Sequence, residues 1–247
     1  MTTWEKLIEI KEKRGAGYFV LIDPDKQSLE KSVEIAIQAE QEDVDAILIG
    51  GSLLATQIFD ALIKQIKDQV HIPLIIFPGG VQQVSGHADA ILFMSLISGR
   101  NPDNLIGQQV MAAPIVKSIG LEAIATAYML IESGKVSSAE FMSNTRPIPR
   151  DKTDIAVAHA LAAEYLGKKI LYLEAGSGAL NPVPDKMIAS VSKMCSLPVI
   201  VGGGITNPEI ARQKVAAGAG FVVTGNVLEQ NNKDGKMAEF AKAIHKS

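Results

Sequence analysis

The sequence contains a single cysteine, Cys195, among its 247 residues. One cysteine can form neither an internal disulfide nor a cysteine-rich metal site, which fits a reducing compartment. No apolar run reaches the ~20 residues that a membrane-spanning helix needs, and the stretch 90–97 is too short. The first residues show no basic-then-apolar signal pattern. We therefore expect a cytoplasmic protein.

The sequence also lacks an excess of positive charge. Its formal net charge is −3, so it offers no basic surface of the kind that nucleic-acid binding usually needs. Hydrophobic residues make up 47% and charged residues 21%, which allows a large core and excludes global disorder. No composition shift or Pro/Ser-rich linker divides the chain. We expect one domain over residues 1–247.

Short β-branched apolar runs alternate with longer segments of helical periodicity along the whole chain. Runs such as 46–49 and 221–223 are apolar throughout, which is typical of strands buried on both faces. Strands are predicted at residues 18–23, 46–50, 74–77, 90–94, 122–128, 169–174, 199–202 and 220–224. Helices are predicted at residues 29–40, 56–68, 104–118, 154–166, 185–194, 208–217 and 237–244.

This alternation predicts an α/β fold, a (β/α)8 TIM barrel. An open doubly wound sheet would also alternate strands and helices. The barrel is favoured because the chain is undivided and because of where its glycines fall. One crossover differs from the others. The residues between Pro78 and Asp89 are too few for a full helix and both its loops, so the third helix is predicted to be short or missing.

Glycine clusters follow the last three predicted strands. They lie at 176–178, 202–204 and 225, with Asn226 directly after the last. In a barrel, chemistry takes place at the carboxyl ends of the strands, and phosphate often binds beyond strands seven and eight. Glycine lets backbone N–H groups approach a phosphate closely. Tight turns alone would explain any one cluster, but the three together predict a phosphate site.

Polar side chains at other strand ends are predicted to point into the same mouth. Asp23 ends the first strand and Ser52 follows the second, which would give Mg²⁺ a carboxylate and a hydroxyl ligand. Alternatively, Asp23 or Asp25 could cap the following helix. Glu174 ends the sixth strand beside the glycines. It could act as a general base on a substrate hydroxyl, or it could be a salt-bridged structural residue.

The remaining reactive side chains are assigned no chemistry. Cys195 ends a predicted helix, where a nucleophilic role is not expected. The acidic run 42–45 precedes the second strand at the bottom of the barrel, where charges are usually solvated. The four histidines lack zinc-type spacing and are interpreted as surface or packing residues. They are His71, His87, His159 and His245.

Six motifs, in this order and spacing, resemble the geranylgeranylglyceryl phosphate synthase family. They are LIDPDK at 21–26, IGGS at 49–52, SNTRPIPRDK at 143–152, YLEAGSG at 172–178, GGGI at 202–205 and VTGN at 223–226. The resemblance implies a TIM barrel with a replaced third helix, and a homo-oligomer, either a dimer or a hexamer. It also implies a prenyltransferase. Such an enzyme moves a geranylgeranyl group from geranylgeranyl diphosphate to the C3 hydroxyl of sn-glycerol 1-phosphate, forming the first ether bond of archaeal-type membrane lipids.

The same resemblance implies the site residues. It places Mg²⁺ on Asp23 and Ser52, and it makes Glu174 the group that deprotonates the acceptor, so Asp23 and Glu174 are the expected catalytic residues. The expected substrate-binding residues are Tyr172, Leu173, Glu174, Ala175, Gly176, Ser177, Gly178, Gly203, Gly204, Gly225 and Asn226.

The chain departs from some members of the family at Leu21. Those members carry a lysine at this position, which helps to hold the glycerol phosphate. The segment 144–152 resembles a branch that lacks this lysine. In that branch, Arg150 or Lys152 could supply the missing positive charge.

Three further interpretations stay open. A sugar-phosphate isomerase or aldolase would share the phosphate glycines, but it would need a strand-end lysine or a paired acid and base. A barrel that only binds a phosphometabolite is the second alternative. The third concerns small and apolar residues that either wall a groove for the prenyl chain or belong to the ordinary core. They are Ala112, Ala113, Ile124, Ala125, Thr126, Ala127 and Tyr128. The sequence has no DDxxD repeat, which excludes the all-helical isoprenoid synthases as relatives.

Overall fold

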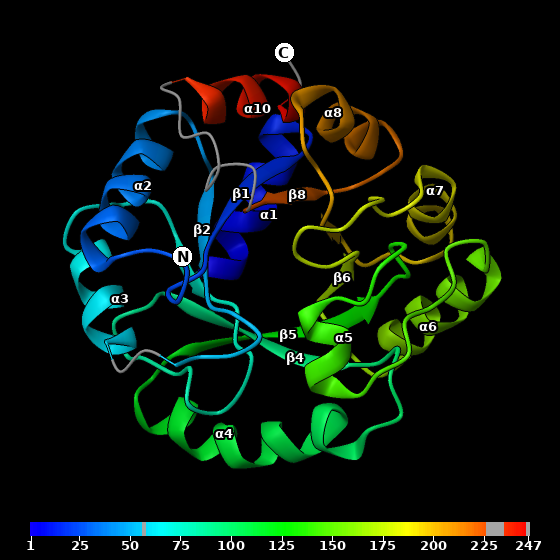
Figure 1. Cartoon of the computed structure of the whole chain (residues 1–247), viewed down its shortest axis with the longest axis horizontal. Helices are drawn as coiled ribbons and strands as arrows, with labels where there is room; N and C mark the ends of the chain where they lie inside the picture. The colour runs from blue at the N-terminus through cyan, green and yellow to red at the C-terminus, as the bar shows by residue number, and fades with distance from the viewer. Residues whose placement is uncertain (56–57, 226–234, 246–247) are drawn as a thin grey trace.

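Eight parallel strands form a closed barrel in the computed structural model, which describes residues 1–55, 58–225 and 235–245 (Figure 1). Each strand pairs with the next along the chain, and β1 pairs with β8 to close the ring. The predicted TIM barrel is therefore confirmed. The strands are β1 Gly17–Ile22, β2 Ala46–Ile49, β3 Leu74–Ile76, β4 Ala90–Leu96, β5 Glu122–Leu130, β6 Ile170–Glu174, β7 Val199–Gly202 and β8 Phe221–Thr224. Because all pairings are parallel, the carboxyl ends of the strands lie at one rim.

Helices surround the barrel in a ring (Figure 1). They are α1 Thr3–Arg14, α2 Leu29–Gln41, α3 Phe59–Lys67, η1 Asp103–Gly107, α4 Gln108–Ser118, α5 Ser138–Ser143, α6 Thr153–Tyr165, α7 Asp185–Met194, α8 Pro208–Ala216 and α10 Lys236–Ile244. Every predicted helix is present with small shifts at its ends, but α1 and α5 were not predicted. Trp4, Leu7 and Ile10 of α1 form a short apolar stripe at helical spacing that packs on the inner cluster, a signal that the sequence analysis did not use.

The crossover from β3 to β4 has no helix over residues 77–89, as its length predicts. Gln83 ties this crossover to the carboxyl end of β2. Its fully buried side chain donates a hydrogen bond to the Gly51 carbonyl at 2.8 Å and accepts one from the Gly51 amide at 3.3 Å. An extended loop therefore lies against the mouth of the barrel where other crossovers carry a helix.

The strands separate two apolar layers, one inside the barrel and one beneath the helices. Phe19 and Phe221 stack inside the barrel at 4.8 Å between ring centroids, and Leu7 of α1 packs with them. Side chains alternate along a strand. Tyr172 belongs to the inner cluster, so Glu174 lies on the inner side two residues later. Leu173 belongs to the outer cluster instead.

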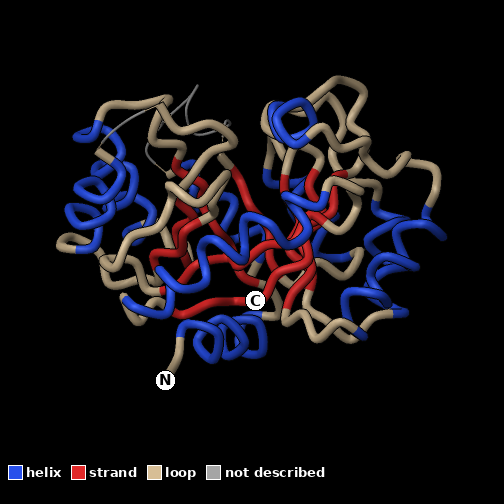
Figure 2. Tube along the Cα trace, turned by 90° about the horizontal axis from the view of Figure 1, so that it is seen from below, coloured by secondary structure: helices blue, strands red, loops and turns tan. Residues whose placement is uncertain are grey.

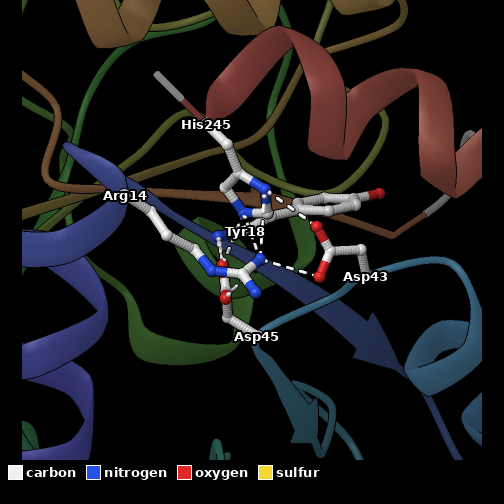
Figure 3. A network of polar contacts seen from close by, with 5 residues as sticks. All are labelled: Arg14, Tyr18, Asp43, Asp45 and His245. Atoms are coloured by element: carbon white, nitrogen blue, oxygen red, sulfur yellow. Dashed lines mark hydrogen bonds and ion pairs between the residues drawn. The ribbon is translucent and has the colours of Figure 1, made fainter. Parts of the chain in front are cut away.

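The opposite rim is closed by a network of charged side chains (Figure 3). Asp45 accepts hydrogen bonds from the Tyr18 amide at 2.7 Å and from His245 at 2.8 Å, and it lies 3.3 Å from Arg14. Its side chain is only 3% exposed. The prediction of a solvated acidic run is therefore wrong for Asp45, because these partners replace water.

The chain's N-terminus lies at the end of the barrel away from the long loops (Figure 2).

Candidate active site

A cleft of about 450 Å³ opens at the rim that carries the carboxyl ends of the strands. It brings together residues predicted from five different strand ends. Those that line it are Asp23, Ser52, Tyr172, Glu174, Gly176, Ser177, Gly178, Gly203, Gly204 and Gly225. The side chains of Leu173 and Ala175 are not among them, because both pack into the outer layer beneath the helices. Asn226 lies outside the described residues.

Glu174 is buried at the end of β6, with an exposure of only 6%. Its Oε1 accepts a hydrogen bond from the Gly176 amide at 2.6 Å. Burial raises the pKa of the Glu174 carboxyl to about 7, although the hydrogen bond from the Gly176 amide opposes the shift. Within the described part of the chain no cation forms an ion pair with it. The described residues therefore give no support to the alternative of a salt-bridged structural glutamate, and the carboxyl can change its charge near neutral pH.

Glycine is required around this carboxyl because backbone segments pack directly against it. Gly203 has a φ of +83°, and a Cβ there would lie 2.5 Å from Glu174 Oε1 and 2.6 Å from the Gly176 nitrogen. Gly176 has a φ of +99°, and a Cβ there would lie 2.5 Å from Ser137 Cβ. Larger residues would push the two loops apart. The glycines therefore bring backbone amides to the edge of the cleft.

The Tyr172 hydroxyl is buried without a hydrogen-bond partner among the described residues. Its ring is held firmly, since it stacks on Phe77 at 5.2 Å and meets the edge of Tyr128 at 5.3 Å. Leaving a buried hydroxyl unpaired costs about 1–3 kcal/mol. A polar group of a ligand in the cleft would remove this cost.

Asp23 follows β1, and its side chain is 21% exposed. Its Oδ1 accepts a hydrogen bond from the Asp25 amide at 3.1 Å, while Asp25 itself accepts one from the Ala55 amide at 2.7 Å. The following helix, α2, is capped instead by Ser28, whose hydroxyl accepts from the Lys31 amide. The capping alternative is therefore wrong for both aspartates. Asp23 instead faces the cleft.

The donor set at this end of the cleft fits a magnesium ion shared with a substrate. Asp23 and Ser52 both line the cleft, and Gly51 leaves space beside the carboxylate, because a Cβ there would lie 3.0 Å from Asp23 Oδ1. Within the described ranges, no group of three or more His, Cys, Asp or Glu could hold a metal. Mg²⁺ commonly takes only one or two carboxylates and completes its shell with water and substrate phosphates.

A lysine that the sequence analysis missed lies between the two groups of polar residues. Lys26 Nζ is 3.6 Å from Asp23 Oδ2 and donates to Ser177 Oγ at 3.2 Å. Neither Arg150 nor Lys152 lines the cleft. The Arg150 guanidinium is instead bound to the carbonyls of Glu132 and Pro182 at 3.1 and 3.3 Å. The signal for Lys26 was its place at the end of the motif that carries Asp23.

A second cavity of about 380 Å³ continues from the cleft and is mainly apolar. The two cavities share five residues, namely Gly51, Ser52, Phe77, Tyr128 and Ala139. Most of the walls come from the helix-free crossover and from β4, including Val81, Ile91, Leu92, Phe93, Met94 and Leu96. Of the residues suggested for such a groove, Ala112 and Tyr128 line it. Ala113, Ile124, Ala125, Thr126 and Ala127 do not.

Comparisons with known proteins agree with this geometry. The model of the PcrB family matches residues 8–244. A geranylgeranylglyceryl phosphate synthase from Chitinophaga pinensis is 44% identical over 242 residues, covering 98% of this chain and 95% of the relative. This chain belongs to the geranylgeranylglyceryl phosphate synthase family. Another member, from Thermococcus gammatolerans, is 46% identical and covers 92% of this chain, with 89% of its own length matched.

A solved structure of the family has nearly the same fold. The enzyme from Thermoplasma acidophilum, in complex with its substrate sn-glycerol-1-phosphate, superposes with a TM-score of 0.94. It is 33% identical, and the match covers 99% of this chain and 98% of that one. A thiamine phosphate pyrophosphorylase from Pyrococcus furiosus, with 15% identity and a TM-score of 0.61, shares only the fold. Like the sequence, the described helices offer none that is long and apolar enough to span a bilayer.

Proposed function

We propose that this chain transfers a geranylgeranyl group from geranylgeranyl diphosphate to the C3 hydroxyl of sn-glycerol 1-phosphate, with Mg²⁺ as cofactor. The product carries the first ether bond of archaeal-type lipids. One observation supports this proposal most strongly. A cleft with glycine loops and a buried carboxyl with a pKa near 7 opens directly into an apolar groove. A polar acceptor and a long apolar donor would meet at that junction.

The acceptor would bind on the β6–β8 side of the cleft. Backbone amides of the loops that contain Gly176 and Gly203 would hold the phosphate, and Lys26 would add the positive charge that Leu21 does not supply. The unpaired Tyr172 hydroxyl would then hydrogen-bond to the glycerol. Glu174 would accept the proton of the attacking C3 hydroxyl, for which a pKa near the working pH is suited.

The donor would place its chain in the apolar groove and its diphosphate beside Asp23. Asp23 and Ser52 would hold Mg²⁺ there, and the bound ion would neutralise the charge of the leaving diphosphate. The carbon–oxygen bond to the diphosphate breaks with its electron pair on the leaving group, and the glycerol oxygen forms the new bond to the allylic carbon. Holding both reactants in one cleft supplies much of the acceleration by proximity.

The two alternative functions fit this geometry less well. A small sugar phosphate would not occupy the apolar groove. A Schiff-base aldolase needs a desolvated lysine, whereas Lys26 lies next to the Asp23 carboxylate. A barrel that only bound an anion would gain nothing from Glu174, whose negative charge opposes anion binding.

The implied homo-oligomer stays a prediction.

A direct assay tests the proposed function. Purified protein, labelled sn-glycerol 1-phosphate and Mg²⁺ are incubated with farnesyl, geranylgeranyl or heptaprenyl diphosphate, and ether products are separated by chromatography. We expect most product from the geranylgeranyl donor and far less when sn-glycerol 3-phosphate replaces the acceptor. Absence of any ether product with all three donors would reject the proposal.

Lys26 offers a separate test of how the acceptor is held. We expect Lys26→Met to raise KM for glycerol 1-phosphate about tenfold, because a charge-assisted hydrogen bond contributes about 1.5–3 kcal/mol. Calorimetric titration of glycerol 1-phosphate without donor should show the same loss of affinity. Lys31→Met is the matched control, since Lys31 pairs with Glu34 on the exposed side of α2. Equal affinities for both variants would exclude this role of Lys26.

A further inference from the structure

Three aromatic rings meet where the polar cleft joins the apolar groove. Phe77 and Tyr172 stack with centroids 5.2 Å apart, and Tyr128 meets both rings edge-on, at 5.3 Å from Tyr172 and 5.8 Å from Phe77. Phe77 and Tyr128 line both cavities. Phe77 follows β3 at the start of the helix-free crossover, packs on the inner apolar cluster and is only half-buried.

The proposed base lies against the same cluster. A Cβ on Gly202 would lie 2.7 Å from both Glu174 Oε2 and the Tyr172 hydroxyl, so these two groups are adjacent, and the Tyr128 ring packs against Tyr172 at 5.3 Å. The hydroxyl that Glu174 deprotonates must touch the allylic carbon when the new bond forms. A donor with its chain in the groove and its reacting carbon beside Glu174 must therefore cross the junction, where the rings of Phe77 and Tyr128 form part of the wall.

We propose that Phe77, supported by Tyr128 and Tyr172, is a catalytic residue that stabilises the positive charge on the allylic carbon through its ring face. This inference rests on the proposed function. As the bond to the diphosphate breaks, its electron pair leaves with the diphosphate and the allylic fragment becomes positively charged. The glycerol oxygen then supplies the pair for the new bond, and its proton passes to Glu174. Between these events the fragment has no covalent partner, and an aromatic face attracts a cation without reacting with it.

The ring faces would also protect the cation from water, which would capture it as an alcohol. An aromatic wall excludes water and still offers negative electrostatic potential on its face. The rings are also fixed by their mutual packing, so little reorganisation is needed when the charge develops.

Substitution of Phe77 by phenylalanines with one, two and three fluorines tests the electrostatic role. Fluorine withdraws electron density from the ring face but keeps its shape nearly unchanged, so the variants should fold. We expect the single-turnover rate of ether formation to fall stepwise with each fluorine and about tenfold in total. The affinity for a non-reactive thiolodiphosphate donor should stay within about twofold.

Phe240 provides the matched control. Its ring also stacks on a tyrosine, Tyr18, at 5.9 Å, but it is buried in the outer apolar layer and lines neither cavity. The same fluorine series at Phe240 should leave the single-turnover rate unchanged. Phe77→Leu, which keeps an apolar side chain but removes the ring, should lower the rate at least tenfold, and thermal unfolding would verify that the variant is folded.

The outcomes separate this inference from the proposed function. If the unmodified protein forms no ether product, the proposed function fails first. If it is active and the rate shows no trend with fluorination at Phe77, or the same trend at Phe240, the catalytic role of Phe77 is rejected. A loss of donor affinity without a loss of rate would likewise reject it, because packing alone explains that result.

Discussion

Glu174 and Asp45 are both buried carboxylates at strand ends, but they lie at opposite rims of the barrel. Asp45 precedes β2 and is surrounded by donors, namely the Tyr18 amide, His245 and the Arg14 guanidinium (Figure 3). Glu174 ends β6 and accepts one backbone hydrogen bond in a cleft walled by aromatic rings and glycine backbone. The two carboxylates are thus equally buried. Asp45 has cationic side chains and hydrogen-bond donors that offset its negative charge, whereas Glu174 has one backbone hydrogen bond.

This difference separates a structural carboxylate from a reactive one. The partners of Asp45 link α1, the start of β2 and the end of α10, which are distant in sequence, so its charge helps to close the barrel. The charge of Glu174 is left without such partners, and its pKa rises to about 7. Burial alone therefore does not mark a catalytic group. The absence of compensating charge near a cleft does.

Glu174→Gln should give the largest effect, and that effect is a loss of activity. We expect kcat for ether formation to fall by at least about 10²-fold, the usual contribution of one acid–base group, while KM for both substrates changes little. Single-turnover measurements with saturating substrates would show it. The same substitution should also stabilise the fold at pH 8, because it removes an uncompensated buried charge.

The stability effect has a definite sign. The folded pKa of Glu174 is about 7, above its ordinary value of 4.5, so between these pH values the folded chain binds more protons than the unfolded one. The free energy of unfolding therefore falls as pH rises through this window. Relative to Glu174→Gln, we expect the unsubstituted chain to lose roughly 3 kcal/mol between pH 4.5 and 7.5. An active and less stable Glu174→Gln variant would contradict the assigned role.

Asp45→Asn should have the opposite pattern, with a loss of stability and no loss of chemistry. Asparagine can still accept the Tyr18 amide, but Arg14 and His245 lose their buried counter-charge. We expect urea unfolding to show a loss of about 2 kcal/mol, less than for a fully buried pair because Arg14 is 38% exposed. The kcat per folded molecule should stay unchanged. A tenfold loss of kcat would show that the two rims are coupled.

The sequence predicted the barrel and the cleft better than it predicted the opposite rim. The strands are mainly apolar runs, and the residues at their carboxyl ends must meet at one rim once the sheet is parallel and closed. The glycines and Glu174 were therefore found from position alone. Asp45 was not, because its partners Arg14 and His245 lie near the two ends of the chain and no local pattern connects them to it.

Side-chain contacts between separate loops could not be predicted from the sequence either. Lys26 stands beside Asp23 in the sequence, but only the folded chain shows that it touches Ser177. Residues of β5 and α4 were considered either as walls of an apolar groove or as ordinary core, whereas the walls come largely from the helix-free crossover and β4. The short crossover was predicted correctly, and the cavity that it leaves is a consequence that requires the packing of Gln83 and Phe77 to be known.

The pH dependence of the chemical step should show the smallest effect and bear most directly on the comparison. Glu174 must be ionised to accept a proton, so the single-turnover rate should rise about tenfold per unit of pH below about 7 and level off above it. The phosphate of the acceptor also titrates in this region, with a second pKa near about 6, and would alter binding. Saturating both substrates removes that contribution from the observed rate, and the residual activity of Glu174→Gln reports any part that does not come from Glu174. The Asp45→Asn variant should keep the same inflection near pH 7, because Asp45 lies at the far rim. If the inflection of the rate with pH shifts in Asp45→Asn but persists in Glu174→Gln, the proton transfer belongs to another group. Glu174 would then not differ from Asp45 in its role.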